Sequence, residues 1–176
     1  MELRSAIEGR RSIRKYKSDK IDDEIILEIL KEATHAASGH NRQPWKFKIV
    51  NDLEKEKIAN TLYDKFKDVK GHTAPHTAGV IREIPNLVVV YLDNDEDSFR
   101  EIDILSIGGM IDEILLLAEE KEIGTLWIAN TNLIKDEIKN ITNVNLETIS
   151  CIGFGLKDQF PSKRPRKDFS DIVINN

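Results

Sequence analysis

The chain has 176 residues, 40% of them hydrophobic and 32% charged, a balance typical of one globular domain spanning residues 1–176. The net charge of −5 argues against general affinity for nucleic acid, and the single cysteine, Cys151, excludes a disulfide within the chain. The most apolar stretch, 104–118, is too short to span a bilayer, and the charged start offers no apolar core for a signal peptide, so we expect a soluble, cytoplasmic protein.

Two helices are expected before the first strand. The first covers about residues 3–11, with Leu3, Ala6 and Ile7 on its inner face. The second begins after Asp22, which is a good N-cap, and its apolar residues recur at helical spacing until it ends near Ser38-Gly39.

The middle of the chain predicts a strand, a helix and a long loop. Residues 45–50 alternate as WKFKIV and indicate a strand, after which Asp52 is expected to cap a helix over 53–66. Residues 68–85 contain two glycines and two prolines and are expected to form a loop. This loop is the best candidate for a lid over a binding site, and for the element that determines which molecules the site accepts.

The second half predicts a buried strand and the longest helix. Residues 86–92 read NLVVVYL, which is typical of a strand buried on both faces. Residues 101–122 form a helix that is apolar over most of its circumference. Because Gly108 and Gly109 each cost about 1 kcal/mol in a helix interior, we expect another backbone to approach there, such as that of a partner subunit.

The remaining elements complete an α+β or α/β sandwich. Strands are expected at 125–129 and 149–156 with a short helix at 134–141 between them. The tail from Pro161 has no core of its own and needs a surface to cover. The pattern predicts helices packed on a small sheet.

Basic residues gather at both ends of this acidic chain. They are Arg4, Arg10, Arg11, Arg14, Lys15, Lys17 and Lys20 at the start, and Lys163, Arg164, Arg166 and Lys167 near the end. From composition alone they are either two solvated charge runs or one anion site assembled from both termini. The four histidines do not have the spacing of a zinc site, so we expect no metal; His72 and His76 are expected on the surface of the 68–85 loop.

Four segments carry residue types suited to binding a flat, phosphorylated cofactor. RRSIRKY (10–16) offers guanidinium forks for phosphate, and SGHNRQPW (38–45) offers polar side chains beside an aromatic ring. AEEKEIGTLWI (118–128) carries a glycine where a helix passes into a strand, and RPRK (164–167) offers extended cations. In this order and at these distances, the four segments resemble the motifs of the FMN-dependent nitroreductase family over nearly the whole chain.

The resemblance implies a nitroreductase-like α+β sandwich of helices on a small mixed sheet, in an intertwined homodimer with an exchanged C-terminal tail and two FMN sites at the subunit interface. It implies that the FMN phosphate, ribityl chain and pyrimidine edge are held by Arg10, Arg11, Ser12 and Arg14. It also implies that Ser38 and Asn41 reach the flavin from the partner subunit, that Gly124 and Thr125 lie near the ring, and that Arg164 or Arg166 contacts the phosphate.

The resemblance further implies an oxidoreductase in which FMN carries the chemistry and no side chain is a catalytic nucleophile. Hydride would pass from NAD(P)H through FMN to a nitro-aromatic, a quinone or a similar small acceptor in ping-pong order. Because the chain is short, the alternative is a flavin-binding protein that has a different electron donor or a different role, as a ferredoxin-linked reductase, a flavin carrier or a flavin-modifying enzyme. No Rossmann glycine motif follows a strand, so no separate dinucleotide site is expected.

Overall fold

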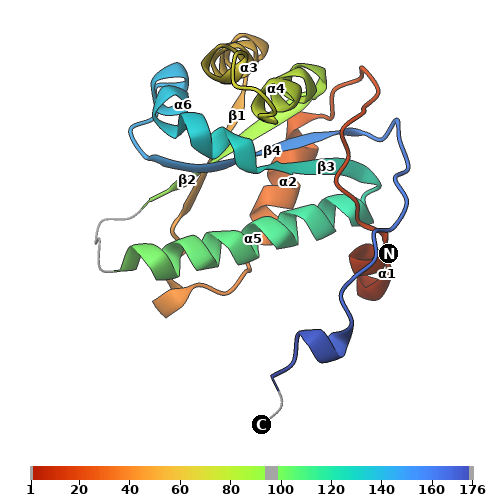
Figure 1. The fold of residues 1–176 in the computed structure, drawn as a ribbon. Helices are drawn as coiled ribbons and strands as arrows, with labels where there is room; N and C mark the ends of the chain where they lie inside the picture. The colour runs from red at the N-terminus through yellow and green to blue at the C-terminus, as the bar shows by residue number, and fades with distance from the viewer. Residues whose placement is uncertain (1, 94–98, 175–176) are drawn as a thin grey trace.

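A computed structural model describes residues 2–93 and 99–174 of the chain (Figure 1). The helices and strands, in chain order, are α1 (Leu3–Gly9), α2 (Asp23–Ala33), β1 (Trp45–Val50), α3 (Asp52–Phe66), α4 (Ala74–Glu83), β2 (Asn86–Leu92), α5 (Arg100–Glu120), β3 (Ile123–Ile128), α6 (Lys135–Thr142) and β4 (Glu147–Leu156). Short 3-10 turns lie at η1 (Gly39–Asn41), η3 (Ala129–Ile134) and η4 (Phe169–Asp171). No helix among these residues is long and apolar enough to cross a membrane.

The four strands form one sheet in the order β1-β2-β4-β3. Every neighbouring pair is antiparallel, with Trp45 opposite Leu92 at one edge and Ile123 opposite Leu156 at the other. Among the described residues, parallel pairing is limited to an isolated bridge between Ser12 and Thr125. The mixed character expected of the sheet is therefore confined to the outer edge of β3, where the N-terminal segment lies.

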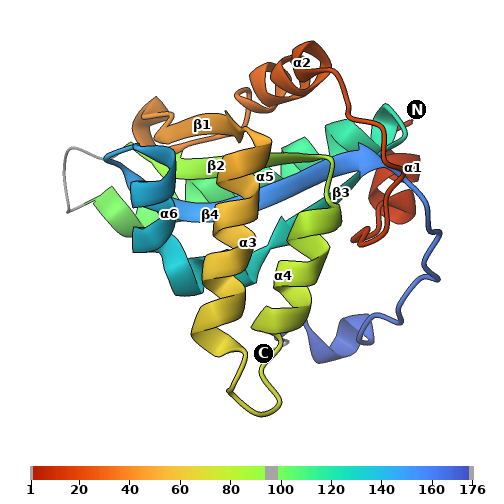
Figure 2. The ribbon, with the colours of Figure 1, turned by 90° about the horizontal axis from the view of Figure 1, so that it is seen from above.

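Helices cover both faces of the sheet (Figures 1 and 2). On β2, Val88 and Val90 face the core shared with α2 and α5, whereas Leu87 and Val89 face the core shared with α3, α4 and α6. This alternation is the period-two geometry of a strand, applied to a strand that is apolar on both sides. The expected sandwich of helices on a small sheet is confirmed.

Residues 74–83 form helix α4, so the expectation of a loop over 68–85 is wrong for most of that range. Pro75 lies in the first turn, where the missing N–H costs no hydrogen bond, and Pro85 follows the end of the helix. The His72 ring stacks on Phe66, and its Nδ1 accepts a hydrogen bond of 3.1 Å from the Ala74 N–H. The prolines thus delimit a helix whose inner face packs on the sheet.

Other helix boundaries also differ from expectation. Asp22 caps α2 as predicted, but α2 ends at Ala33 rather than near Ser38-Gly39. The N-cap of α3 is Asn51 and not Asp52, because Asn51 forms a reciprocal capping box with Glu54.

The outer faces of α1, α5 and the tail leave apolar side chains exposed. Leu3 and Ile7 on α1 were expected inside but are exposed, and only Ala6 is buried. Leu105 on α5 is 76% exposed, and nothing lies within 4 Å of a Cβ built on Gly108 or Gly109. The backbone expected against these glycines is therefore not supplied by the described part of the chain.

The C-terminal tail leaves β4 beside α1 and then runs away from the body of the molecule (Figures 1 and 2). Residues 160–174 are exposed throughout. They include Phe160 and Ile174, which are 88% and 94% exposed, so much of the apolar surface of the tail is left uncovered by the described chain.

Candidate functional site

The N-terminal segment that follows α1 lies along the outer edge of the sheet. Ile13 is buried, and its N–H donates to the Thr125 carbonyl at 2.9 Å. Further on, the Lys17 N–H donates to the Leu156 carbonyl at 3.0 Å, and Tyr16 pairs with Lys157. The segment is therefore fixed against β3 and the end of β4.

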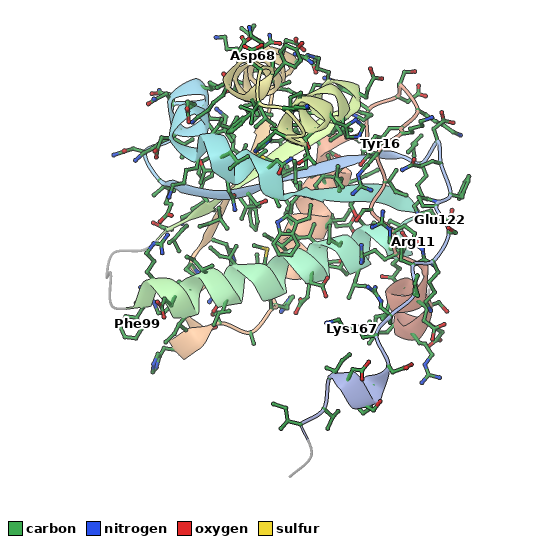
Figure 3. The ribbon with its side chains drawn as sticks, viewed as in Figure 1. Arg11, Tyr16, Asp68, Phe99, Glu122 and Lys167 are labelled. Carbon is green, nitrogen blue, oxygen red and sulfur yellow. The ribbon has the colours of Figure 1, made fainter. Side chains whose placement is uncertain are left out.

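A cavity of about 340 Å³ lies where the two ends of the chain meet. Its lining comprises Ile7, Glu8, Arg10, Arg11, Ser12, Arg14, Pro161, Ser162, Lys163, Arg164 and Arg166. Six of these side chains are cationic and one is acidic. Figure 3 shows Arg11 and Lys167, from opposite termini, on the same side of the molecule. The structure therefore brings the two basic runs together at one cavity, including both candidate tail arginines.

Arg11 has a structural contact in addition to lining this cavity. Its Nη1 donates to the carbonyls of Glu8, Gly9 and Arg10 at 2.7, 2.9 and 2.8 Å. The last carbonyls of a helix have no partner within the helix, and a cation there also interacts favourably with the helix dipole. Its Nε is buried and has no hydrogen-bond partner among the described residues. Arg11 thus caps α1 while its guanidinium borders the cavity.

A second cavity, of about 450 Å³, lies on the other side of Arg14. It is lined by Arg14, Lys15, Tyr16, His76, Gly79, Val80, Glu83 and Asp158. The Tyr16 hydroxyl donates to the Ile13 carbonyl at 2.7 Å, and burial raises the pKa of Tyr16 although the nearby Arg14 opposes the shift. Tyr16 therefore remains a neutral hydrogen-bond donor at physiological pH.

Sequence reasoning missed the contribution of α4 to this second cavity because it treated the segment as a loop. His76, expected on a loop surface, lies on the cavity wall beside Gly79 and Val80. The glycines and prolines of this segment are typical of loops, so its helical spacing was not recognised.

Gly124 and Thr125 lie behind the N-terminal segment rather than on a cavity wall. Neither belongs to the lining of the two cavities described above. A Cβ on Gly124 would come within 2.9 Å of Lys157 Cγ and 3.1 Å of Ile13 Cγ1, so the position needs glycine for packing. These residues hold the segment that carries Ser12.

Ser38 and Asn41 lie in a turn with an unusual backbone. His40, Asn41 and Gln43 have positive φ angles of 51°, 55° and 48°. The Gln43 N–H donates to Ser38 Oγ at 3.1 Å, and Gln43 Nε2 donates to Asn41 Oδ1 at 3.3 Å. Non-glycine residues in this region cost free energy and persist only where the surroundings hold them.

The surroundings that hold the turn are at the start of α5. Arg42 Nε donates to both carboxylate oxygens of Asp103, at 3.2 and 3.3 Å, and the Arg42 guanidinium stacks over Phe99 at 4.7 Å. The Gly39 N–H donates to Ser106 Oγ at 3.3 Å. Asp103 is fully buried. Sequence reasoning missed this anchor, and the signal was a carboxylate among the inward-facing residues of an apolar helix.

The turn lies at the start of α5, and α1, whose end borders the arginine-lined cavity, lies at the other end of that helix (Figure 1). The turn contacts Ser106 near the start of the helix, whereas Gly9 faces Glu119 near its end. Because α5 has 21 residues, it is about 30 Å long. Within one chain, Ser38 and Asn41 therefore do not join Arg10, Arg11 and Ser12.

Other reactive groups do not form a second chemical centre in the part of the chain that the structure describes. No group of three or more His, Cys, Asp or Glu side chains there is arranged to hold a metal ion. Cys151 is buried on β4, and burial raises the pKa of its thiol to about 12. The thiol is therefore protonated and unreactive.

A family model and a curated relative both match most of the chain. A model of the family described as "Nitroreductase family" matches residues 7–156. The Bacillus subtilis protein YfhC, provisionally named an NAD(P)H nitroreductase, is 27% identical over 96% of this chain and 91% of its own length.

Two solved structures share the fold. A provisionally named nitroreductase from Desulfovibrio desulfuricans, in complex with FMN, has a TM-score of 0.84 at 20% identity and covers 100% of this chain and 97% of its own. The NADPH:FMN oxidoreductase of Vibrio harveyi, complexed with NAD+, has a TM-score of 0.82 at 22% identity over 99% of this chain and 76% of its own. At these identities the similarity establishes the architecture.

Proposed function

The chain belongs to the nitroreductase family, and from this membership we propose that it is an FMN-dependent oxidoreductase that uses NAD(P)H to reduce a nitro-aromatic, a quinone or a similar small acceptor. The observation that carries the proposal is the convergence of cations from both termini on one cavity. A structure of the same fold in complex with FMN, and another that is named an NADPH:FMN oxidoreductase, support the choice of cofactor.

The donor set of the arginine-lined cavity fits a flavin phosphate. The lining contains six cationic side chains and one acidic side chain. The planar guanidinium groups of the arginines can each form paired hydrogen bonds to phosphate oxygens. We assign phosphate and ribityl binding to Arg10, Arg11 and Ser12, together with Arg164 or Arg166 from the tail.

Arg14 is suited to the pyrimidine edge of the ring because it lines both cavities. FMN, when bound, supplies the two-electron chemistry, and NAD(P)H and the acceptor would use the site in turn. Arg14 would stabilise the negative charge that reduction places near N1 and the C2 carbonyl. The helix α4, with His76, Gly79 and Glu83 on the second cavity, replaces the expected loop as the element that sets acceptor specificity.

A two-fold homodimer would complete the site. Within one chain, Ser38 and Asn41 lie at the opposite end of α5 from the arginines. A two-fold axis near the middle of the helix would bring the turn of a second copy to the cavity. Gly109 is close to the helix midpoint, is exposed and has open space around it. The exposed apolar tail would then cover the second copy.

The proposed function is tested by the colour and reducibility of the purified protein. We expect yellow protein that loses its visible absorbance when NADH or NADPH is added without oxygen. Bound FMN that neither donor reduces would favour the alternative of a ferredoxin-linked reductase, a flavin carrier or a flavin-modifying enzyme. Colourless protein that cannot be reconstituted with FMN would refute both.

The dimer is tested by Gly109→Ala. In a chain acting alone, alanine at this open helical position would raise the free energy of unfolding by about 1 kcal/mol. If two α5 helices cross there, the added methyl group instead separates them, and the melting temperature falls most at low protein concentration. Gly79→Ala is the control, because Gly79 is also helical with open space around it but lies on α4, away from the proposed crossing.

A further inference from the structure

A nearly buried ion pair lies behind the arginine-lined cavity. Lys157 Nζ donates to Glu119 Oε2 at 2.7 Å, and the two side chains are only 16% and 11% exposed. Removing two charges from water is costly, so a pair of this kind is weak evidence for stability by itself. Its location between three chain segments points to a role in positioning them.

The pair joins three segments that the sequence places far apart. Glu119 is in the last turn of α5 and faces Gly9 at the end of α1. Lys157 directly follows β4, forms the isolated bridge to Tyr16, and packs its stem over Gly124. The Asp158 N–H then donates to the Lys15 carbonyl at 3.1 Å. The N-terminal segment and the start of the tail are therefore paired beside one fixed point on α5.

Arg11 separates this ion pair from the site. A small cavity of about 120 Å³ is lined by Gly9, Arg11, Ile13, Glu119, Lys157, Gln159, Phe160 and Pro161. Arg11 and Pro161 line both this cavity and the larger one that holds the other cations. Any shift of Lys157 would therefore reach Arg11 from one side and the tail cations, which begin at Lys163, from the other.

We infer that Glu119 and Lys157 are positioning residues that align the basic segments from the two termini so that they bind one phosphate group together. The inference rests on the proposed function, because it takes the phosphate of FMN as the ligand. Without Lys157, the buried Glu119 carboxylate would share the small cavity with Arg11 as the remaining cation of its lining, and it would compete with the phosphate for that guanidinium.

The test compares FMN with riboflavin, which has the same ring and lacks the phosphate. Dissociation constants of both flavins are measured by fluorescence titration on the full-length protein for the wild type, Lys157→Met and Glu119→Gln. We expect the wild type to prefer FMN, and Lys157→Met to weaken FMN binding roughly tenfold or more while riboflavin binding changes little. The isosteric Glu119→Gln, which keeps a hydrogen-bond acceptor and the local packing, should reduce the same preference by a smaller factor.

Lys48→Met is the matched control. Lys48 is a partly buried lysine that binds Glu54 at 2.6 Å and the Thr142 carbonyl at 2.7 Å, between β1, α3 and α6. The Lys48→Met variant should have a lower melting temperature and an unchanged ratio of the dissociation constants for FMN and riboflavin. If the Lys157 and Glu119 variants keep the wild-type ratio, as this control does, the positioning role is wrong. If the wild type itself binds riboflavin as tightly as FMN, the proposed phosphate site fails first.

Discussion

Replacing Arg11 with alanine separates two roles that the structure assigns to one side chain. Arg11 borders the cationic cavity, and its Nη1 also contacts three carbonyls at the end of α1. A hydrogen bond to a charged group contributes about 1.5–3 kcal/mol, so loss of a phosphate contact should weaken FMN binding by roughly 10- to 150-fold. Loss of the helix-end contacts should in addition lower the free energy of unfolding by about 1 kcal/mol.

The assay is titration of apoprotein with FMN and with riboflavin, combined with urea unfolding of the apoprotein. Riboflavin keeps the ring and ribityl chain, so its affinity reports any general damage to the site. Arg4→Ala is the control, because Arg4 is an exposed cation on the same helix and is not part of the cavity lining. We expect Arg4→Ala to leave both affinities unchanged.

Arg11 has no contact with the phosphate if Arg11→Ala is destabilised but binds FMN as tightly as the wild type does. Arg11 would then be only the cap of α1, and the phosphate contacts would fall to Arg10 and the tail arginines. Equal weakening of FMN and riboflavin would refute the phosphate assignment in another way, because it would show that the helix end shapes the ring site.

Three further changes test the framework around the site. Gly155→Ala would place a methyl group 2.7 Å from Tyr16 Cδ1 and should lower the free energy of unfolding by about 1–3 kcal/mol in urea titrations; an unchanged midpoint would contradict this packing. Arg42→Met leaves the fully buried Asp103 carboxylate without the charge of Arg42. The free energy of unfolding should fall by about 3 kcal/mol in the same assay, which is well beyond the effect of removing an exposed ion pair. The pKa of Glu147 is lowered, chiefly by the hydrogen bond from Arg100, so this pair stabilises the fold above the ordinary value of 4.5 and loses its effect as the pH falls through the lowered pKa. Glu147→Gln should therefore be less stable than the wild type by about 0.5–1 kcal/mol at pH 7, and the difference should shrink as the pH falls below the ordinary pKa of glutamate.

The first two strands were the elements that the sequence predicted best. The bounds of β1 and β2 agree with expectation, because an alternating run and an uninterrupted apolar run are both distinct from helical spacing. Helix ends were less certain where two capping residues adjoin. Asn51 and Asp52 are both good N-caps, and the deciding signal is Glu54, three residues after Asn51.

The sequence shows the charged residues of the candidate site but not the ion pairs that lie beside them. Cations at both termini were visible in the sequence, and the structure brings them to one cavity. The ion pair at the turn joins residues 61 positions apart, Arg42 and Asp103, and the pair beside the basic segments joins residues 38 apart, Lys157 and Glu119. Local spacing carries no information about such partners, because only the packing of the finished fold brings them together.

Both buried acids of these pairs belong to α5. Asp103 holds the strained turn, Glu119 lies beside the basic segments, and 16 residues of helix, or about 24 Å, separate them. A continuous helix keeps that distance fixed, so the turn and the basic segments cannot approach each other within one chain. The midpoint of the two acids is at Ile111, only two residues from Gly109. A two-fold axis there would exchange the two ends of the helix and place each turn beside the arginines of the other copy, which would explain why one helix carries two buried carboxylates and a glycine pair that lowers its own stability.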